Sequence, residues 1–515
     1  MGVPFRRLLR ASEAWRRLRG AIWRARPERV PLSEALGRVL AEDVVAGVDV
    51  PPFDRAAMDG YAVRSEDVQG ADEWRPVDLR LVGSIEAGEP PSVEVSAGEA
   101  VEVSTGAPMP PGADAVVMVE HTLRVGDSVR VLRSVQRGAN VYHAGSDIAL
   151  GETVVAKGTV LGPAEIGALA SLGVERVKVY VRPSVAILSV GNELVPPGNE
   201  LPPYKVYDVN SYSLAAAVAS CGCRPRIEGL VPDDKRAVAE AVTAAIERCD
   251  VVLTSGGTSA GRGDYVYRAL GELGEVLVHG LKLKPGKPTV IADVRGKPVI
   301  GLPGYPLSAL MAFELVVRPL LETLSGYRSP PTRRAVTALL ATRVIPEKGR
   351  MNVIPVCLRK SPSGLVAYPL FKGSGAVTAL LLADGFLVTR EDEQFIGEGE
   401  EREVRLLRPL DQLPDLTGIG SHCMALELAL RILRERGVKT RYVAQGSSAA
   451  FVAVREGAAD FGGAHLLDPV TGDYNVPYLE TFGLKGKAVI VRGYLREQGF
   501  IVRPGNPLGI RSFKD

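Results

Sequence analysis

The alternation of strand-like and helix-like segments over residues 183–328 constrains the fold of this 515-residue chain more than any other feature. Apolar, β-branched runs such as VAILSV, DVVLT and PVIG are separated by helical patterns such as SYSLAAAVASCG and KRAVAEAVTAAIERC, and SALMAFELVVRPLLETLSG predicts one closing helix. Strands joined by crossover helices form mostly parallel sheets whose faces are covered by helices. We therefore predict an α/β domain in which ligands bind beyond the carboxyl ends of the strands.

Four other blocks surround this domain. Residues 51–140 and 329–408 contain short alternating runs split by Gly and Pro, which predict two small β domains, the second a barrel or a sandwich. Residues 1–50 and 141–182 contain helical patterns, including SEALGRVLAEDV and AEIGALASLG, and we expect them to form one helical linker domain around the inserted block. Residues 409–515 predict a partial α/β tail with KAVIVRGYLR as a strand. The predicted fold class is thus multidomain, α/β and β.

The composition narrows the classes of partner. Lys and Arg total 62 against 60 for Asp and Glu, and aromatic residues make up 6%, so neither a broad positive field nor stacking platforms point to nucleic acid. Five cysteines make no disulfide framework or paired zinc motif, and no run of about 18 apolar residues predicts a membrane span. We expect a cytoplasmic protein that binds neither nucleic acid nor membranes.

Two carboxylates follow predicted strands. Glu193 lies in GNEL after the first strand, and Asp264 ends the glycine-rich SGGTSAGRGD after the second. Paired carboxylates beside an anion-binding loop suit a hard divalent cation that also takes substrate oxygens. Asp and Glu also stabilise helix N-termini, so simple helix capping stays open as an alternative.

Glycines and lysines suggest an anion site at the same edge. Gly256 and Gly257 would let backbone N–H groups turn toward an anion, although a tight strand-to-helix turn is the favoured explanation of the glycines taken alone. Lys284 and Lys287 lie in LKLKPGKP, a lysine cluster in a lysine-poor chain. Their compact ammonium groups suit phosphate or another oxyanion, with a solvated turn as the alternative.

Seven motifs taken together resemble the molybdopterin molybdenumtransferase family of MoeA type, which also supplies the E domain of gephyrin. In order they are PFDRAAMDGYAV, STGAPMPPGADAVVM, GANVYHAGSDI, SVGNEL, SGGTSAGRGDY, KPGKP and GLPGYP. The resemblance covers about residues 5–408. It implies insertion of molybdenum from molybdate, or tungsten from tungstate, into adenylylated molybdopterin with Mg²⁺ and release of AMP, the last step of molybdenum cofactor biosynthesis.

The same resemblance implies an elongated homodimer and assigns the site. The 51–140 domain of one subunit would face the α/β domain of the other, forming a shared active site. Four residues are expected to be catalytic, of which the first two would hold Mg²⁺: Glu193, Asp264, Asp59 and Asp147. Substrate binding is assigned to Thr105, Asp233, Gly256, Gly257, Lys284, Lys287, Pro303 and Pro306. The family often has Asn where Tyr305 stands, which leaves the pterin contacts of GLPGYP open.

The tail resembles a different family. GSHCMALELAL, VAQGSSAAFVAV and RPGNPLGI are similar to the periplasmic-binding-protein-like domain fused to some relatives, although Cys423 stands where that family usually has Asp. We expect roughly half of that domain within residues 409–515. Gly446, Ser447 and Ser448 before a predicted helix could bind an oxyanion through backbone N–H groups, with a structural turn as the alternative.

Other functions stay open at this stage. A molybdopterin adenylyltransferase shares the SGGTS and GLPG region but would not need residues 1–182. A non-catalytic pterin-binding scaffold would not require the charged residues Glu193, Asp264 and Lys284. An oxyanion sensor acting through the tail is a third alternative. Molybdopterin adenylyltransferase and molybdoenzymes are the further partners that the resemblance makes possible.

Overall fold

A computed structural model describes residues 8–20, 23–258, 263–327, 335–361, 364–371, 373, 375–493, 501–512 and 514, and the chain divides into two compact units after residue 332. Within these ranges no helix has both the length and the apolar character needed to cross a membrane.

Six strands form the central sheet of the first unit, in the order β16-β13-β17-β21-β20-β18. They are β13 Ser184–Val190, β16 Arg224–Val231, β17 Val251–Ser255, β18 Glu275–His279, β20 Val290–Val294 and β21 Lys297–Leu302. The first four neighbours are parallel, and β20 runs antiparallel to both β21 and β18. The predicted mostly parallel sheet is confirmed, and five of its strands end at one edge.

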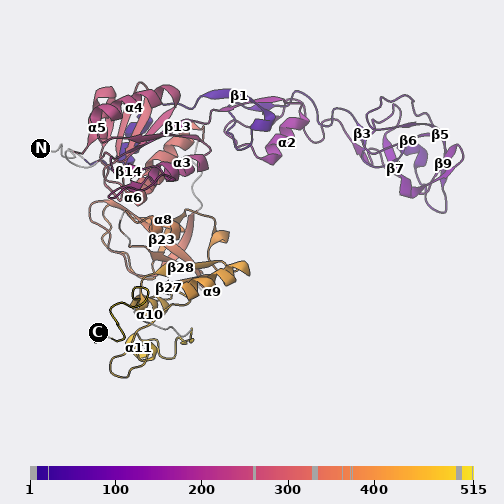
Figure 1. The fold of residues 1–515 in the computed structure, drawn as a ribbon. Helices are drawn as coiled ribbons and strands as arrows, with labels where there is room; N and C mark the ends of the chain where they lie inside the picture. Colours follow the sequence, from indigo (N-terminus) through magenta and orange to yellow (C-terminus); the bar gives the residue numbers. More distant parts are fainter. Residues whose placement is uncertain are drawn as a thin grey trace. The chain divides into compact units, whose positions relative to one another are not determined.

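Helices cover both faces of this sheet (Figure 1). They are α3 Asn210–Ser220, α4 Lys235–Arg248, α5 Tyr265–Leu273 and α6 Pro306–Ala312. Val238 and Val242 of α4 belong to the buried cluster that contains Leu188 of β13. The adjacent Ser189 instead contacts Ser211 of α3, with 2.9 Å between the two hydroxyl oxygens. Because successive strand residues point to opposite faces, α3 and α4 lie on opposite sides of the sheet.

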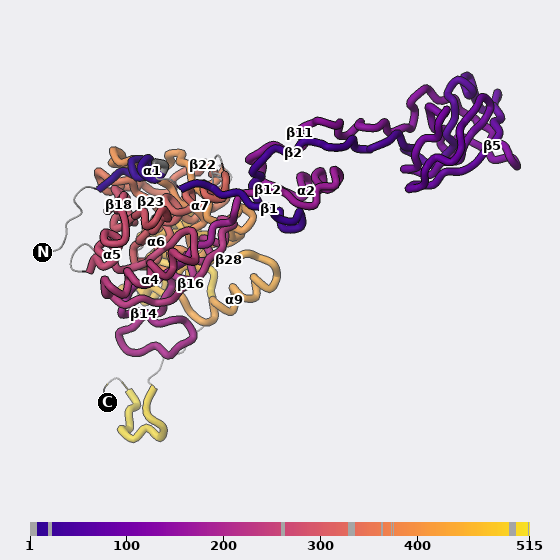
Figure 2. Tube along the Cα trace, turned by 90° about the horizontal axis from the view of Figure 1, so that it is seen from above, coloured from indigo at the N-terminus to yellow at the C-terminus, as the bar shows by residue number. Residues whose placement is uncertain are grey.

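The closing helix differs from its prediction in one respect. A π-helical segment, Phe313–Val317, separates α6 from α7 Arg318–Leu324. The N-terminal helix α1, Ala11–Gly20, lies beside β18, and Trp15 Nε1 donates to the Leu315 carbonyl at 3.1 Å (Figure 2). The helix α1 therefore packs on the α/β domain, whereas we expected it in a helical linker.

The linker region itself contains little helix. The strand β1 Pro27–Pro31 pairs with β12 Arg176–Tyr180, and β2 Val44–Val45 pairs with β11 Thr153–Val155. The predicted helix α2 is present at Pro163–Ser171. The helix predicted at SEALGRVLAEDV is wrong: only a 3₁₀ turn forms at Leu32–Glu34. Gly37 has φ +69°, outside the helical region, and isolated β-bridges join Val39 to Val160 and Leu40 to Val179 of β12.

The inserted block 51–140 is a six-stranded sheet with order β7-β4-β6-β5-β9-β8. Its strands are β4 Gly60–Val63, β5 Val77–Ile85, β6 Glu99–Val103, β7 Ala115–Met118, β8 Thr122–Val125 and β9 Ser128–Val131. Tyr61 and Val63 enter one buried cluster and Ala62 enters another, as strand alternation requires. A shorter pair joins β3 Arg55–Ala56 to β10 Val141–Tyr142. We call residues 51–148, which contain both sheets, the β lobe.

The second unit begins with a small barrel. Its strands are β22 Ala335–Leu340, β23 Met351–Ser361, β24 Gly364–Pro369, β25 Gly385–Val388 and β26 Glu401–Leu406, with helix α8 at Val377–Leu382. They pair in the order β23-β24-β22-β26-β25, and β25 also pairs with β23. The ring of pairings is closed, so the predicted barrel is confirmed.

The tail packs against this barrel. Its parallel strands are β27 Leu416–Gly420 and β28 Thr440–Ala444, and its helices are α9 Met424–Glu435, α10 Ser447–Arg455 and α11 Val476–Thr481. Asp384 of the barrel is fully buried, and its Oδ2 accepts from the Leu358 N–H and from Arg441 Nη1 of the tail, both at 2.8 Å. Residues 487–493 of the predicted KAVIVRGYLR strand are not paired, and Val489 and Val491 are exposed.

Substitution of Gly256 tests the geometry of the turn from β17 into the glycine-rich loop. A Cβ at this residue would lie 2.1 Å from the Val190 carbonyl oxygen, and φ is +91°. We expect Gly256→Ala to lower the free energy of unfolding by about 3 kcal/mol or more. Gly271→Ala is the control, because Gly271 lies in α5 with open space around it, and Ala there should be stabilising by up to about 1 kcal/mol. Thermal unfolding measures both, and equal effects would contradict this prediction.

Arg441 tests the attachment of the tail. We expect Arg441→Ala to lower the free energy of unfolding by about 3–5 kcal/mol. The substitution removes the nearer cation from the buried Asp384 carboxylate and leaves the more distant Arg408, whose Nε is 3.8 Å away. Arg431, which pairs with Glu435 at the surface of α9, serves as the control, and its replacement by Ala should cost about 0.5 kcal/mol or less. Differential scanning calorimetry of the full chain would measure the stability of both variants. An Arg441→Ala variant as stable as the wild type would contradict a stabilising buried pair.

Candidate functional site

The candidate site lies at the edge where the parallel strands of the α/β domain end. β16, β13, β17 and β21 are successive parallel neighbours, and each is followed directly by a loop that contains a predicted site residue. Those loops contain Asp233, Glu193, Gly256 with Gly257, and Pro303, in the order of the strands. The lysine loop follows β18, which ends at the same edge. The sheet therefore brings the α/β members of the predicted site to one edge.

The first two loops are bonded to each other. The Asn192 N–H donates to Asp233 Oδ2 at 3.1 Å, and the Asp233 N–H donates to Asn192 Oδ1 at 3.2 Å. Lys205 Nζ donates to the Asn192 carbonyl. Glu193 is exposed next to this reciprocal pair, and its carbonyl accepts from the Val206 N–H at 2.9 Å. The backbone around Glu193 is thus fixed while its side chain faces solvent.

Gly256 and Gly257 allow the second loop to approach its neighbours closely. The Gly256 N–H donates to the Leu302 carbonyl at 3.1 Å, and Gly304 lies so close that a Cβ there would be 3.4 Å from the Gly256 Cα. A Cβ at Gly257 would meet Val190 Cγ1 at 2.9 Å. The Gly256 N–H is already engaged, so this residue differs from the free anion donor that we expected. The residues that follow, 259–262, lie outside the described ranges.

Asp264 is a buried capping residue. Its side chain is 1% exposed, and Oδ1 accepts from the Tyr267 N–H at 3.3 Å at the start of α5. Oδ2 accepts from His279 Nε2 at 3.0 Å, and the His279 ring stacks on Tyr267 with 3.7 Å between centroids. The capping alternative is therefore realised for Asp264. His279 was not predicted, because only the packing of α5 on β18 places it beside Asp264.

The lysine loop connects β18 to β20. The Lys284 side chain is exposed and that of Lys287 is half-buried. The Leu281 N–H donates to the Lys287 carbonyl at 2.9 Å, and Leu9 holds the segment from the other side, because its carbonyl accepts from the Lys282 N–H at 2.8 Å. Backbone hydrogen bonds therefore hold the lysine loop at Leu281, Lys282 and Lys287.

These residues do not form a preformed magnesium site. Among the described residues no group of three or more His, Cys, Asp and Glu side chains is placed to hold a metal ion. Asp264 is occupied by His279 and by its own helix, so Glu193 and the half-buried Asp233 are the carboxylates left for a cation. Mg²⁺ often binds through one or two carboxylates together with substrate phosphates, so the metal assignment stays a prediction of the resemblance.

A buried polar cluster joins three of the loops, and sequence reasoning did not single it out. Asn210 Nδ2 donates to Ser255 Oγ and to the Gly304 carbonyl, each at 2.7 Å. Ser255 Oγ in turn donates to the Pro303 carbonyl at 3.1 Å. Asp208 Oδ1 accepts from Ser189 Oγ at 2.9 Å. This cluster fixes the relative positions of α3, the glycine loop and the GLPGYP loop, which places Pro303 beside the glycine loop, and Pro306 is the first residue of α6.

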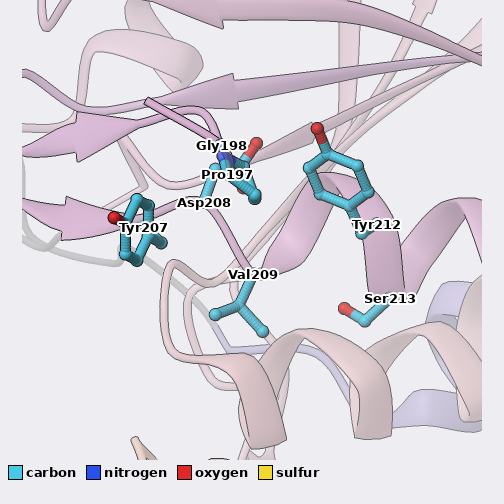
Figure 3. Close-up of a pocket in the computed structure, with 7 residues that line it drawn as sticks. All are labelled: Pro197, Gly198, Tyr207, Asp208, Val209, Tyr212 and Ser213. Atoms are coloured by element: carbon cyan, nitrogen blue, oxygen red, sulfur yellow. The ribbon is translucent and has the colours of Figure 1, made fainter. Parts of the chain in front are cut away.

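A hollow of about 790 Å³ opens next to this cluster (Figure 3). Its lining comes from the segment between β14 Leu194–Val195 and β15 Val206–Tyr207 and from the start of α3. The lining residues are Pro197, Gly198, Tyr207, Asp208, Val209, Tyr212 and Ser213. Tyr207 and Tyr212 lie on opposite sides of the hollow, with Val209 between them (Figure 3). The hollow is shallow and open, both tyrosines are exposed, and Asp208 is one of its lining residues.

The β lobe carries the other predicted residues. Asp59 is exposed, and its Oδ1 accepts from the Thr105 N–H at 2.6 Å and from Thr105 Oγ1 at 2.7 Å. These bonds, the backbone one first, hold the pKa of Asp59 below its ordinary value. The MDG and STGAP motifs therefore form one structure, in which Asp59 stays a carboxylate at neutral pH.

The third β-lobe motif, GANVYHAGSDI, folds onto the first. Asp54 Oδ1 accepts from the Ala144 N–H at 2.8 Å, and Asp54 Oδ2 lies 3.1 Å from His143 Nδ1. The Ala144 N–H, followed by His143, lowers the pKa of Asp54. The Asp147 N–H donates to the Val50 carbonyl at 3.0 Å and leaves the side chain exposed. Asp54 and His143 were not predicted, although both stand inside motifs that were quoted.

The tail positions its glycine-serine loop at the start of α10. Ser447 Oγ accepts from the His465 N–H at 3.0 Å and lies 3.2 Å from His465 Nδ1. Cys423 stands at the N-cap of α9, where its Sγ accepts from the Leu426 N–H at 3.4 Å. The structural-turn alternative accounts for these contacts, and oxyanion binding stays a prediction.

Comparison with protein families places four matches along the chain. Residues 9–173 match the MoeA N-terminal region (domain I and II), residues 186–323 a probable molybdopterin binding domain, and residues 337–407 the MoeA C-terminal region (domain IV). Residues 430–515 match a PBP superfamily domain.

Individual relatives agree with these matches. Molybdopterin molybdenumtransferase 2 of Mycobacterium tuberculosis is 35% identical over 405 residues, which cover 77% of this chain and 99% of the relative. A putative molybdopterin biosynthesis protein of Methanocaldococcus jannaschii is 34% identical over 389 residues, which cover 74% of this chain and 92% of the relative. The crystal structure of a molybdopterin biosynthesis MoeA protein from Pyrococcus horikoshii is 40% identical, covers 78% of this chain and all of that one, and has a TM-score of 0.70. This chain therefore belongs to the MoeA family of molybdopterin molybdenumtransferases.

Proposed function

We propose that this protein inserts molybdenum into adenylylated molybdopterin and releases AMP in molybdenum cofactor biosynthesis. The observation that carries the proposal is the convergence of Glu193, Asp233 and the loop of Lys284 and Lys287 at one edge of the sheet, in a chain of the MoeA family. Both reactants are anions, and an edge that combines lysines with carboxylates can gather them together with a cation.

The chemistry divides into two balanced steps. Water supplies an oxygen to one phosphorus of the pyrophosphate link, and the bridging oxygen leaves with the other, so that AMP and a phosphate monoester result. The two thiols of the dithiolene then bind the molybdenum of molybdate, and one oxo oxygen leaves as water with both thiol protons. Neither step requires a protein nucleophile. The role of the protein is to position two anions and to offset their charge.

Each group at the edge has a definite task in this scheme. Lys284 and Lys287 bind phosphate or molybdate oxygens by charge-assisted hydrogen bonds. Glu193, exposed on a fixed backbone, would bind the cation that accompanies a pyrophosphate, and the loop of Asp233 is bonded to the loop of Glu193 through Asn192. Asp264 bonds to the start of α5 and contacts His279, and its role as a metal ligand stays a prediction of the resemblance.

We propose that the active site is shared between two copies of the chain. The α/β edge carries the lysines and Glu193, whereas the β lobe carries the exposed Asp59 and Asp147. Each surface supplies what the other does not, which supports a homodimer in which one subunit's β lobe closes the other's edge. All five cysteines are free thiols, which fits a reducing compartment such as the cytoplasm, where we propose that the reaction takes place.

The central test replaces Glu193. We expect Glu193→Ala to lower molybdate-dependent AMP release from adenylylated molybdopterin by about 100-fold or more, because a charge-positioning group is lost without a change in the core. Glu200→Ala is the matched control, since Glu200 is exposed on the same segment and should leave the rate unchanged. Normal turnover by Glu193→Ala would refute the role of Glu193. ATP consumption with free molybdopterin would instead favour an adenylyltransferase.

The pKa of Asp59 provides a test that does not depend on activity. Thr105→Val removes the hydroxyl donor but keeps the backbone N–H, which is the larger cause of the low pKa. We expect the pKa of Asp59, measured by NMR titration, to rise in this variant but to stay below about 3.9, the ordinary value for Asp. Since the folded pKa is depressed, the stability that Asp59 contributes is present above the ordinary pKa and is lost as the pH falls through the folded one. An unchanged titration would show that the Thr105 hydroxyl does not bind Asp59.

A further inference from the structure

The segment that precedes α1 contacts the backbone of the lysine loop directly. The Leu9 N–H donates to the Gly280 carbonyl at 3.2 Å, and the Lys282 N–H donates to the Leu9 carbonyl at 2.8 Å. Leu9 thereby forms a parallel β-bridge with Leu281, and both side chains are buried. The lysine loop is therefore bonded to a segment that lies far from it in the sequence.

Leu9 and α1 form one continuous element along the edge of the sheet. The Ala14 N–H donates to the Arg10 carbonyl at 2.9 Å, which closes the first helical turn directly after Leu9. Ala14 is 1% exposed, and Arg17 Nη1 donates to the Leu277 carbonyl of β18 at 2.9 Å. The strand β18 is the last in the order of the sheet, and an edge strand presents backbone groups to whatever covers it. The N-terminal segment is this cover.

Trp15 attaches α1 at a place where the closing helix lacks an ordinary donor. In a regular α-helix the Leu315 carbonyl accepts from the N–H of residue 319, but that residue is Pro319, which has no N–H. The backbone is π-helical at this point, and the Arg318 N–H bonds to the Phe313 carbonyl. Trp15 Nε1 donates to the Leu315 carbonyl at 3.1 Å. The indole N–H thus supplies a donor that the proline cannot.

We propose that Trp15 is a positioning residue for the anion site. By docking α1 it holds Leu9, and through Leu9 it holds the backbone of the lysine loop. This inference rests on the proposed function, in which Lys284 and Lys287 bind the anionic reactants. Long lysine side chains bind an anion more tightly when their backbone is already fixed, because less conformational entropy is then lost on binding. Docking of α1 and anion binding are therefore coupled, and each favours the other.

Hydrogen exchange on the full chain tests the connection between Trp15 and the lysine loop. Trp15→Phe keeps an aromatic ring but removes the indole N–H. We expect the Lys282 amide, resolved by mass spectrometry of overlapping peptides, to exchange about tenfold faster in this variant. The reason is that undocking of α1 releases this amide from the Leu9 carbonyl.

Trp23→Phe is the matched control, because it also removes an indole N–H that is bonded to the α/β domain. Trp23 Nε1 donates to Asp293 Oδ2 at 2.7 Å. Asp293 pairs with Glu275 at the start of β18, whereas the lysine loop follows the other end of that strand. We therefore expect Trp23→Phe to leave the exchange of the Lys282 amide unchanged.

Inorganic pyrophosphate with Mg²⁺ tests the coupling to anion binding. At about ten times its dissociation constant, an anion that binds only when α1 is docked should slow exchange of the Lys282 amide about tenfold in the wild type. Trp15→Ala removes the whole indole and should weaken pyrophosphate binding about fivefold in calorimetry, because only the docked fraction binds tightly. Trp23→Ala should bind pyrophosphate as the wild type does. Circular dichroism melting curves establish that each variant is folded.

Two results would overturn the inference. One is exchange of the Lys282 amide that is the same in Trp15→Phe as in the wild type, or that Trp23→Phe accelerates equally. The other is pyrophosphate binding that leaves this exchange unchanged, or that is as tight in folded Trp15→Ala as in the wild type.

Failure of the proposed function gives a different pattern. A wild-type protein that binds no pyrophosphate would remove the anion site itself, and the positioning role of Trp15 with it. Molybdate-dependent AMP release by the same preparation is measured separately. Its absence from a protein that shows the coupling would remove the proposed reaction and leave the role of Trp15 in place.

Discussion

The parallel register of four adjacent strands is the constraint on which the candidate site depends. β16, β13, β17 and β21 run in one direction, so the loops that follow them must meet at one edge, whatever their separation in the sequence. The buried strands give these loops a rigid base, and the backbone bond from the Gly256 N–H to the Leu302 carbonyl and the reciprocal Asn192–Asp233 pair connect one loop to the next. The exposed Glu193 side chain thus stands on a fixed frame.

Some polar groups at this edge are hydrogen-bonded within the protein, and others are not. The Asp264 carboxylate and the Gly256 N–H are used within the protein, although both belong to motifs that resemble a reactive site. Glu193 is exposed, and Asn210 Oδ1 is buried without a hydrogen-bond partner in the part of the chain that the structure describes. A motif therefore does not by itself say which of its polar atoms meets the ligand. The distinction comes from counting the hydrogen bonds that each atom already makes.

The sequence predicted what depends on local pattern and missed what depends on packing between distant segments. Continuous apolar runs identify β13 and β17 because both faces of those strands are buried, and the loops after them follow directly. His279 beside Asp264, and Asn210 beside Ser255 and Gly304, arise only when separate elements meet. The failed helix at SEALGRVLAEDV shows the reverse case, where the left-handed Gly37 interrupts a local pattern that was otherwise helical.

In the second unit, a buried ion pair connects the barrel to the tail. Asp384 belongs to the barrel and Arg441 to the tail, and the pair is buried, so without the tail the Asp384 carboxylate would lose its nearer cation and keep the more distant Arg408. Leu413, which connects the segments, is part of the barrel core, and Tyr368 and Arg359 of the barrel both donate to the Gly457 carbonyl. A tail that was only tethered would bury none of these groups. The fused domain is therefore part of the structure that stabilises the barrel.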